Sequence, residues 1–295
     1  MDRADYGPPL RQFLATARLG LLRYRRSKHL LSAFALLWLP VLLMAAVAGF
    51  QMFMSGFAFE NPLQLDRKPF FDEAKTINVK TALETYRLTF QNAFIYFSIF
   101  FVAMIFGQAA VREETDEQTL HYLFLQPVPR WILLAGKLAG FLCMALPLLA
   151  SSLALCQVLA LAPLGPGAFA EAVADHGRLT ALLQEGLVLA LALVAWCGLF
   201  MAIGTAIKAP IIMFFIYGWE VASNFLPQML QQFTISFYVR SLLPARSLQD
   251  PGAIQILAEP AGVIESLLVV GTVVAISLGA TALMVRWREC VYSDA

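Results

Sequence analysis

The stretch VREETDEQTLHYLFLQPVPRWILLAGK, residues 111–137, lies between two apolar runs that are each long enough to cross a bilayer. Its first part is acidic, and the apolar stripe that follows has the i, i+3, i+4 spacing of one helix face, at Leu120, Leu123 and Phe124. Pro127 then turns the chain, and Arg130 precedes the next apolar run. The pattern predicts an amphipathic helix and elbow over 113–130, pinned between two membrane spans and placed to pass force to them.

Composition indicates the class of protein. Of 295 residues, 59% are hydrophobic and only 14% are charged, whereas about 25% of the residues in an average soluble domain are charged. We therefore expect an all-α polytopic membrane protein with a single membrane domain over 1–295. The net charge of +1 gives no reason to expect nucleic acid as a partner.

Apolar runs predict six transmembrane helices, over 30–55, 90–111, 132–161, 187–207, 211–225 and 263–285. A polar segment with charges of both signs, 60–89, is expected as an outer loop that forms a small ordered element. Residues 226–260 are interrupted by four prolines but keep apolar pieces. This mixture predicts broken outer helices that dip partway into the bilayer, where protein covers their backbone.

The segment 9–28 is a basic amphipathic stretch directly before the first span. We expect an interfacial helix in the headgroup plane, with its arginines on anionic lipid; the alternative is a solvated basic tail that only fixes topology. Six spans put both termini on one side, and that side carries 13 of the 21 Lys and Arg residues. The positive-inside rule therefore predicts cytoplasmic termini and a cytoplasmic 113–130 segment.

Cofactor and catalytic motifs are not found in the sequence. The four cysteines have no C-x-x-C spacing and the three histidines are scattered, so neither a disulfide framework nor a metal site is expected. The chain has no G-x-x-x-x-G-K-[ST] phosphate cradle, no H-E-x-x-H and no G-x-S-x-G. We therefore expect no cofactor and no catalytic residue on this chain.

The segment from Gln118 to Lys137 resembles the signature of ABC-2 type transporter permeases. In that family, acidic residues are followed by Gly-Thr-Leu, a leucine-rich turn, Pro-Val-Ser/Thr-Arg and a lysine one turn into the next span. The matching residues here are Thr119, Leu120, Leu123, Pro127, Val128, Arg130, Gly136 and Lys137. The departures are Gln118, His121 and Pro129. The layout of six spans with an N-terminal interfacial helix and broken outer helices resembles the family along nearly the whole chain.

The resemblance implies the permease subunit of an ATP-driven exporter. Two permeases, either a homodimer or two paralogues, would line the substrate path in the plasma (bacterial inner) membrane. A dimer of separate ATPase chains would bind ATP and Mg²⁺, and an outer-face or periplasmic partner would contact 60–89. The alternatives are a membrane scaffold or sensor coupled to an ATPase, and a secondary transporter, although internal repeats and midplane charges typical of the latter are not visible.

Two groups of candidate residues follow. Those expected at the ATPase contact are Glu113, Glu114, Glu117, Thr119, Leu120, Leu123, Phe124, Pro127 and Arg130. Each group has an alternative role. The acids would start a helix, because the helix dipole favours carboxylates at the N-terminus. The apolar stripe would pack on its own spans, and Arg130 would anchor a span end at the headgroups. Glu220, with Arg240, is the candidate for the pathway or gate, because an ionisable residue inside a span suggests function; its alternative is an interfacial or structural role.

Overall fold

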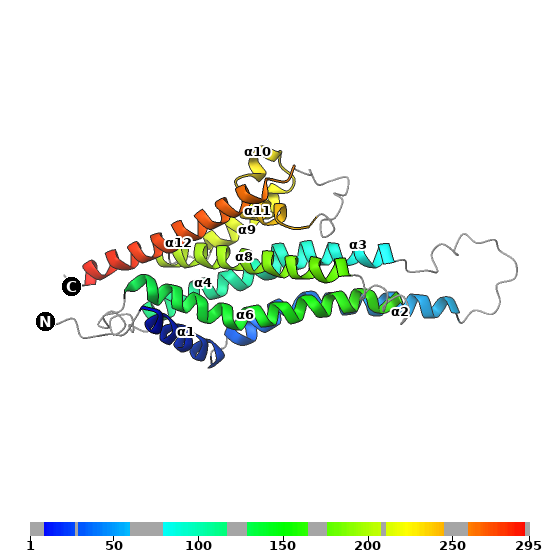
Figure 1. Cartoon of the computed structure of the whole chain (residues 1–295), viewed down its shortest axis with the longest axis horizontal. Helices are drawn as coiled ribbons and strands as arrows, with labels where there is room; N and C mark the ends of the chain where they lie inside the picture. The colour runs from blue at the N-terminus through cyan, green and yellow to red at the C-terminus, as the bar shows by residue number, and fades with distance from the viewer. Residues whose placement is uncertain are drawn as a thin grey trace.

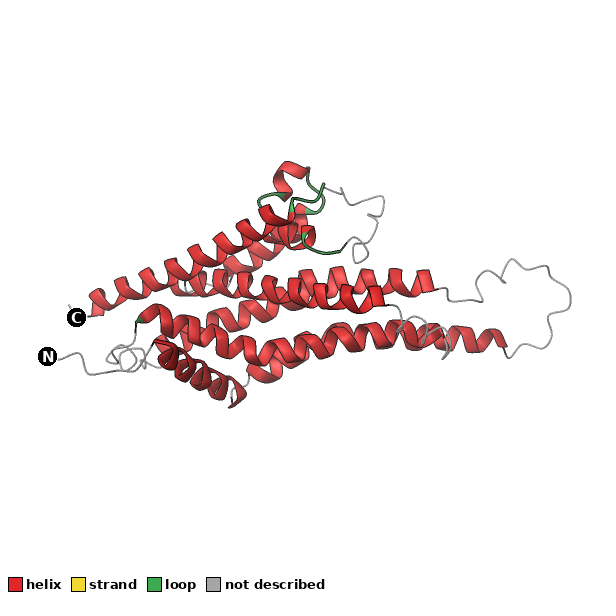
Figure 2. Ribbon diagram, viewed as in Figure 1, coloured by secondary structure: helices red, strands yellow, loops and turns green. Residues whose placement is uncertain are grey.

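The computed structural model describes residues 9–26, 29–59, 79–116, 129–164, 176–207, 211–244 and 259–292. Every regular element in these ranges is a helix (Figure 2). The expected all-α class is therefore confirmed for the part of the chain that the structure describes.

Five helical segments among the described residues are long and apolar enough to cross a membrane: Leu30–Phe53, Ala82–Ala110, Trp131–Leu161, Gly177–Ala206 and Val263–Val285. They belong to α2 (His29–Phe59), to the continuous run of α3 (Val79–Thr89), η1 (Phe90–Ser98) and α4 (Ile99–Asp116), to α6 (Arg130–Leu161), to α8 (His176–Ala206) and to α12 (Val263–Tyr292). The element η1 is a π-helix, and a short 3₁₀ turn, η2 (Ala162–Leu164), follows α6. The helix α1 (Pro9–Arg26) precedes them all.

The second and fourth spans begin earlier than the sequence predicts. The second is helical from Val79 rather than from residue 90, so the last part of the expected outer loop 60–89 belongs to the span. Ala82, Tyr86 and Phe90 are buried at i, i+4 and i+8, so the helix keeps one apolar side among its charges. The fourth span is helical from His176 rather than from 187. Because these extensions also contain charged residues, a search for continuous apolar runs does not detect them.

The expected fifth span is the main difference from six full crossings. Its helix, α9 (Ile211–Ser223), has 13 residues, which extend about 20 Å, whereas the hydrocarbon core is about 30 Å thick. Two short helices follow, α10 (Gln228–Gln231) and α11 (Ile235–Ser241). Broken helices in 226–260 are thus found over 228–241, and residues 245–258 lie outside the described part of the chain.

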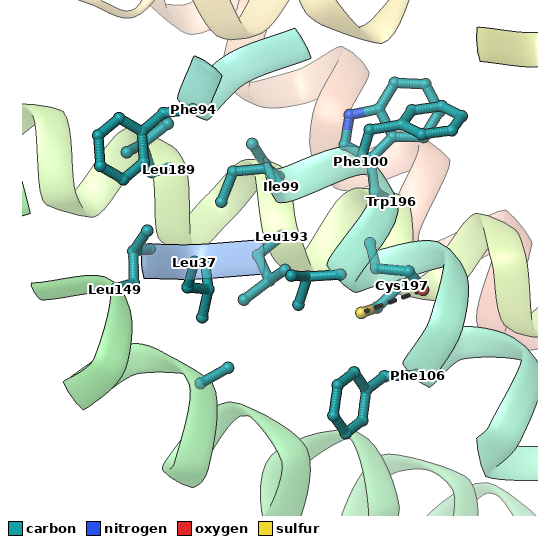
Figure 3. Packing of buried hydrophobic residues seen from close by; sticks show 14 of the residues in the cluster. Leu37, Phe94, Ile99, Phe100, Phe106, Leu149, Leu189, Leu193, Trp196 and Cys197 are labelled. Atoms are coloured by element: carbon teal, nitrogen blue, oxygen red, sulfur yellow. Dashed lines mark hydrogen bonds between the residues drawn. The ribbon is translucent and has the colours of Figure 1, made fainter. Parts of the chain in front are cut away.

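The second span is the centre of the bundle, because 72% of an 18-residue apolar window within it is buried, against 28% for the corresponding window of α2 and 22% for that of α12. Side chains from α2, η1, α4, α6 and α8 meet around it (Figure 3). The ring of Phe100 lies 4.9 Å from Trp196 and 5.0 Å from Phe200, both edge to face. The phenylalanines of the second span therefore form part of the hydrophobic core, and Phe90, Phe94, Phe100 and Phe106 are all buried.

The predicted helix and elbow over 113–130, which we call the coupling segment, is flanked by helices at one end of the bundle. The short helices α9–α11 lie at a different position along it. The helix α1 and the last turn of α12 lie at the same end, and the end of α2 and the start of α3 lie at the opposite end (Figure 1). The group α9–α11 lies beside the first turns of α12, partway along the bundle (Figure 1). The end that holds α1 also holds the end of α4 and the start of α6, which flank the coupling segment.

Candidate functional site

The segment expected to contact an ATPase connects α4 to α6. The first of these helices ends at Asp116 and the second begins at Arg130. Most of the candidate residues between them lie outside the described part of the chain: Glu117, Thr119, Leu120, Leu123, Phe124 and Pro127. The candidate site that the structure does describe is the frame around this segment, which we call the coupling junction: the end of α4, the first turns of α6 and the face of α1 packed on them.

Glu113 and Glu114 belong to the last turns of α4, not to the first turn of a new helix. This position argues against the alternative role, in which these two acids start a helix. At a helix C-terminus a carboxylate meets the negative end of the dipole, which is unfavourable. The helix dipole therefore gives no structural reason for this acidic turn, and its contact with an ATPase stays a prediction.

Lys137 joins the two sides of the coupling junction. Its Nζ donates a 2.8 Å hydrogen bond to the backbone carbonyl of Ala110, at the end of the apolar part of α4. A charged donor to a carbonyl is a strong hydrogen bond, and a mostly apolar setting strengthens it. The bond joins α4 to α6 close to the helix ends that flank 117–129.

The helix α1 lies against α6 with its backbone in close approach. A Cβ on Gly140 would lie 2.6 Å from the carbonyl oxygen of Ala17, and a Cβ on Gly136 would overlap Thr16 Oγ1. On the α1 side, a Cβ on Gly20 would lie 3.5 Å from the Cα of Lys137. Small residues spaced four apart let two helix backbones approach in this way. Gly136 and Gly140 are therefore required here by packing and not by backbone conformation.

Tyr24 anchors the end of α1 in the bundle. It is 4% exposed, and its ring lies 5.4 Å from Phe106 of α4 and 6.2 Å from Phe141 of α6. Phe106 and Phe141 are themselves stacked at 4.3 Å. One aromatic group thus links α1, α4 and α6, and a displacement of the base of α6 must be shared by all three helices.

A second group of polar residues, which we call the outer polar cluster, lies where α9 meets α11: Tyr96, Glu220, Asn224, Thr234, Ser236 and Arg240. The carboxylate of Glu220 accepts hydrogen bonds from the backbone N–H groups of Ile235 at 3.0 Å and Ser236 at 3.2 Å. These two N–H groups belong to the first turn of α11, and Thr234 caps this helix by accepting a hydrogen bond from the N–H of Phe237. Glu220 is 5% exposed. A carboxylate at a helix N-terminus is favoured both by the free N–H groups and by the dipole.

Arg240 belongs to the same cluster but does not act as the main partner of Glu220. Its Nε donates to the carbonyl of Ser236 at 3.4 Å, and its guanidinium carbon lies 5.8 Å from the centre of the Tyr96 ring. Tyr96, in the π-helix η1, donates its hydroxyl hydrogen to Asn224 Oδ1 at 2.6 Å. The cluster therefore connects the second span to α9 and α9 to α11.

The comparison with protein families decides the identity of the chain. The family described as ABC-2 family transporter protein matches residues 20–248, which is more than half of the chain. The chain belongs to this family. A search of curated proteins and a search of solved structures each found no significant match. The resemblance carried by Thr119 to Lys137 is confirmed, and the chain is an ABC-2 type permease, the membrane transport subunit of an ABC transporter.

The structure of this ABC-2 permease brings some predicted site residues together and leaves others apart. Glu220 and Arg240 share the outer polar cluster, whereas Glu113, Glu114 and Arg130 flank the coupling segment on α4 and α6. No group of three or more His, Cys, Asp or Glu side chains in the described ranges is placed to hold a metal ion.

One buried polar pair of the permease is absent from the predicted sites. Tyr86 donates its hydroxyl hydrogen to Glu185 Oε2 at 2.6 Å, and the two residues are 3% and 2% exposed. Glu185 lies just outside the predicted fourth span, because the apolar run begins only at Leu187. The signal that could have found it is the helical spacing of apolar residues upstream of Glu185, which continues the fourth span outward.

Proposed function

We propose that the chain is the permease of an ATP-driven exporter in the plasma (bacterial inner) membrane, with both termini cytoplasmic. Two copies, or the chain and a paralogue, form the substrate path between them. A dimer of separate ATPase chains binds ATP and Mg²⁺ and drives the permeases through 113–130. An outer-face partner contacts 60–78, the part of the expected outer loop that precedes α3.

The observation that carries this proposal is the frame around the coupling segment. The coupling segment connects α4 to α6, and Lys137 of α6 joins the two helices by donating a hydrogen bond to the carbonyl of Ala110 in α4. The base of α6 in turn packs on α1 at Gly136 and Gly140. A force applied to the segment therefore acts on a stiff unit of three helices and not on a free loop. Such a frame suits the transfer of motion from an ATPase to the spans.

The acidic turn at the end of α4 supports the same assignment. Glu113 and Glu114 occupy a helix C-terminus, where negative charge is unfavourable by roughly 0.3–1 kcal/mol for each residue. Contact with basic groups of an ATPase offsets that cost. We therefore keep Glu113, Glu114 and Glu117 as charged contacts, Leu120, Leu123 and Phe124 as the docking face with Thr119 beside it, and Pro127 and Arg130 as the elbow.

For the outer polar cluster we propose a role in a gate. The helix α9 is too short to cross the hydrocarbon core, and the cluster holds its end to η1 and to α11. Movement of the second span is thereby passed to α11 through Tyr96, Asn224 and Glu220. In this proposal Glu220 and Arg240 position the gate helices and do not bind the substrate.

The central experiment is co-purification of the ATPase with the permease. Leu123→Asp or Phe124→Asp places a charge on the docking face and is expected to release the ATPase, whereas His121→Asp places the same charge off the apolar stripe and is expected to retain it. Retention of the ATPase by both stripe variants would place the interface elsewhere. Stimulation of ATPase activity by a candidate substrate in nanodiscs then separates a transporter from a scaffold or sensor, which would show none.

A further inference from the structure

The outward face of α1 combines exposed leucines with exposed arginines. Leu10 and Leu19 are 68% and 66% exposed, and Arg11 and Arg18 are exposed between them. On a helix, residues 11 and 18 share one face because seven residues make about two turns. That face lies opposite Gly20, which is turned toward α6.

The depth of α1 can be read from its contacts with α6. The candidate span on α6 begins at Trp131, which is 62% exposed and suits the interfacial belt where tryptophan is enriched. Gly136 and Gly140 lie five and nine residues farther in, which is about 7 and 13 Å along the helix axis. Amphipathic helices at a membrane surface lie about 5–10 Å into the boundary between headgroups and acyl chains. The seat of α1 is therefore at the level of lipid and not in the cytoplasm.

Charge decides which lipid suits this face. The sequence of α1 contains five arginines and no acidic residue. Within the described ranges no carboxylate forms an ion pair with Arg11 or Arg18, and both side chains are exposed. A phosphate headgroup accepts two hydrogen bonds from one guanidinium, while the neighbouring leucines insert among acyl chains and the arginine stems extend along them.

We infer that the outward face of α1 is a binding surface for anionic phospholipid, and that lipid bound there holds α1 in its seat on α6. The inward face of the same helix is the one that meets Gly136 and Gly140 and packs Tyr24 edge-on against Phe106 and Phe141. Lipid contacts on one face and the glycine seat on the other fix α1 from both sides. The inference goes beyond the proposed function and needs neither the ATPase nor a substrate.

The first test measures lipid contact directly. The full chain is placed in nanodiscs of mixed phosphatidylcholine and phosphatidylglycerol that contain a photoactivatable probe of either lipid, and peptic peptides of 9–26 are analysed for the attached probe. We expect the phosphatidylglycerol probe to be preferred in the wild type. At about 1 kcal/mol for each arginine near an anionic surface, Arg11→Gln with Arg18→Gln is expected to lower that preference about 25-fold.

Matched variants make the test specific. Arg11→Lys with Arg18→Lys keeps the charge and is expected to keep most of the preference, and Arg87→Gln with Arg178→Gln, on α3 and α8, is expected to leave it unchanged. Equal labelling of α1 by the two probes in the wild type, or no loss in the Gln variant, would overturn the inference. Shielding of α1 from both probes when the ATPase is bound would also overturn it, because the face would then belong to a protein interface.

The second test measures the seat. Phosphatidylglycerol added to the full chain in detergent is expected to raise its Tm more than phosphatidylcholine does, because a ligand that binds only the folded state stabilises it. The difference is expected to vanish in the Arg11→Gln, Arg18→Gln variant and to shrink in high salt, which screens exposed charges. An equal rise in Tm with both lipids in the wild type would refute the proposed stabilisation of the seat even if the labelling preference were found.

Discussion

Lys137 Nζ and the carbonyl oxygen of Ala110 lie 2.8 Å apart across 27 residues of sequence. The bond closes the base of the segment on which the proposed ATPase acts. Because Lys137 follows Gly136 directly, the residue that ties α6 to α4 adjoins the residue that seats α6 on α1. Two neighbouring positions thus fix α6 on two sides.

Lys137→Met removes the donor while keeping an unbranched side chain. We expect the end of α4 to open more often, with amide hydrogen exchange over 111–116 faster by about five- to thirty-fold, because buried hydrogen bonds in membrane proteins contribute about 1–2 kcal/mol at most. Lys137→Arg should retain slow exchange. Lys80→Met, on α3 at the opposite end of the bundle, is the control, and unchanged exchange in Lys137→Met would show that the bond does not hold the loop base.

Gly140→Leu is expected to separate α1 from α6, because even a Cβ would lie 2.6 Å from the Ala17 carbonyl oxygen. Overpacking of this kind costs about 1–3 kcal/mol and should lower the Tm of the full chain. Gly279→Leu on α12 is the matched control, since a Cβ there meets nothing within 4 Å. Equal Tm values for the two variants would argue against a close α1–α6 contact.

Glu220→Ala is expected to free the N-terminus of α11. The change leaves the N–H groups of Ile235 and Ser236 without their acceptor, so exchange of these amides should accelerate and transport should fall. Glu220→Gln keeps one acceptor oxygen and should give an intermediate result. Glu265→Gln, an exposed residue on α12, serves as the control. A Glu220→Gln variant with intact transport and an intact complex would remove Glu220 from the gate.

Tyr86→Phe is expected to destabilise the bundle by removing the hydroxyl that bonds Glu185. Double-mutant cycles with Glu185→Gln should give a coupling energy of about 0.6–1.7 kcal/mol, the range for side-chain hydrogen bonds in membrane proteins. Tyr238→Phe, on the less buried face of α11, should have little effect. A coupling energy near zero would mean that the buried pair contributes no net stability.

Much of this architecture could be predicted from the sequence because bilayer thickness and helix rise fix how long an apolar run must be. The third and sixth predicted spans agree with Trp131–Leu161 and Val263–Val285 to within one residue at each end. The signature from Thr119 to Lys137 likewise identified the family, since it depends on local spacing alone. The start of the second span could not be found in this way, because Ala82, Tyr86 and Phe90 form an apolar side only once they face the bundle.

Tertiary structure alone decided how the polar residues are used. The sequence singled out Glu220 and offered Arg240 as its structural partner, but folding brings the free N–H groups of α11 to the carboxylate instead. It also pairs Glu185 with Tyr86, which are 99 residues apart, and seats Gly140 on Ala17. The coupling signature therefore follows from sequence, because short-range spacing encodes it. The hydrogen bonds and close contacts around it depend on which helix faces meet, and only packing of the whole bundle determines that.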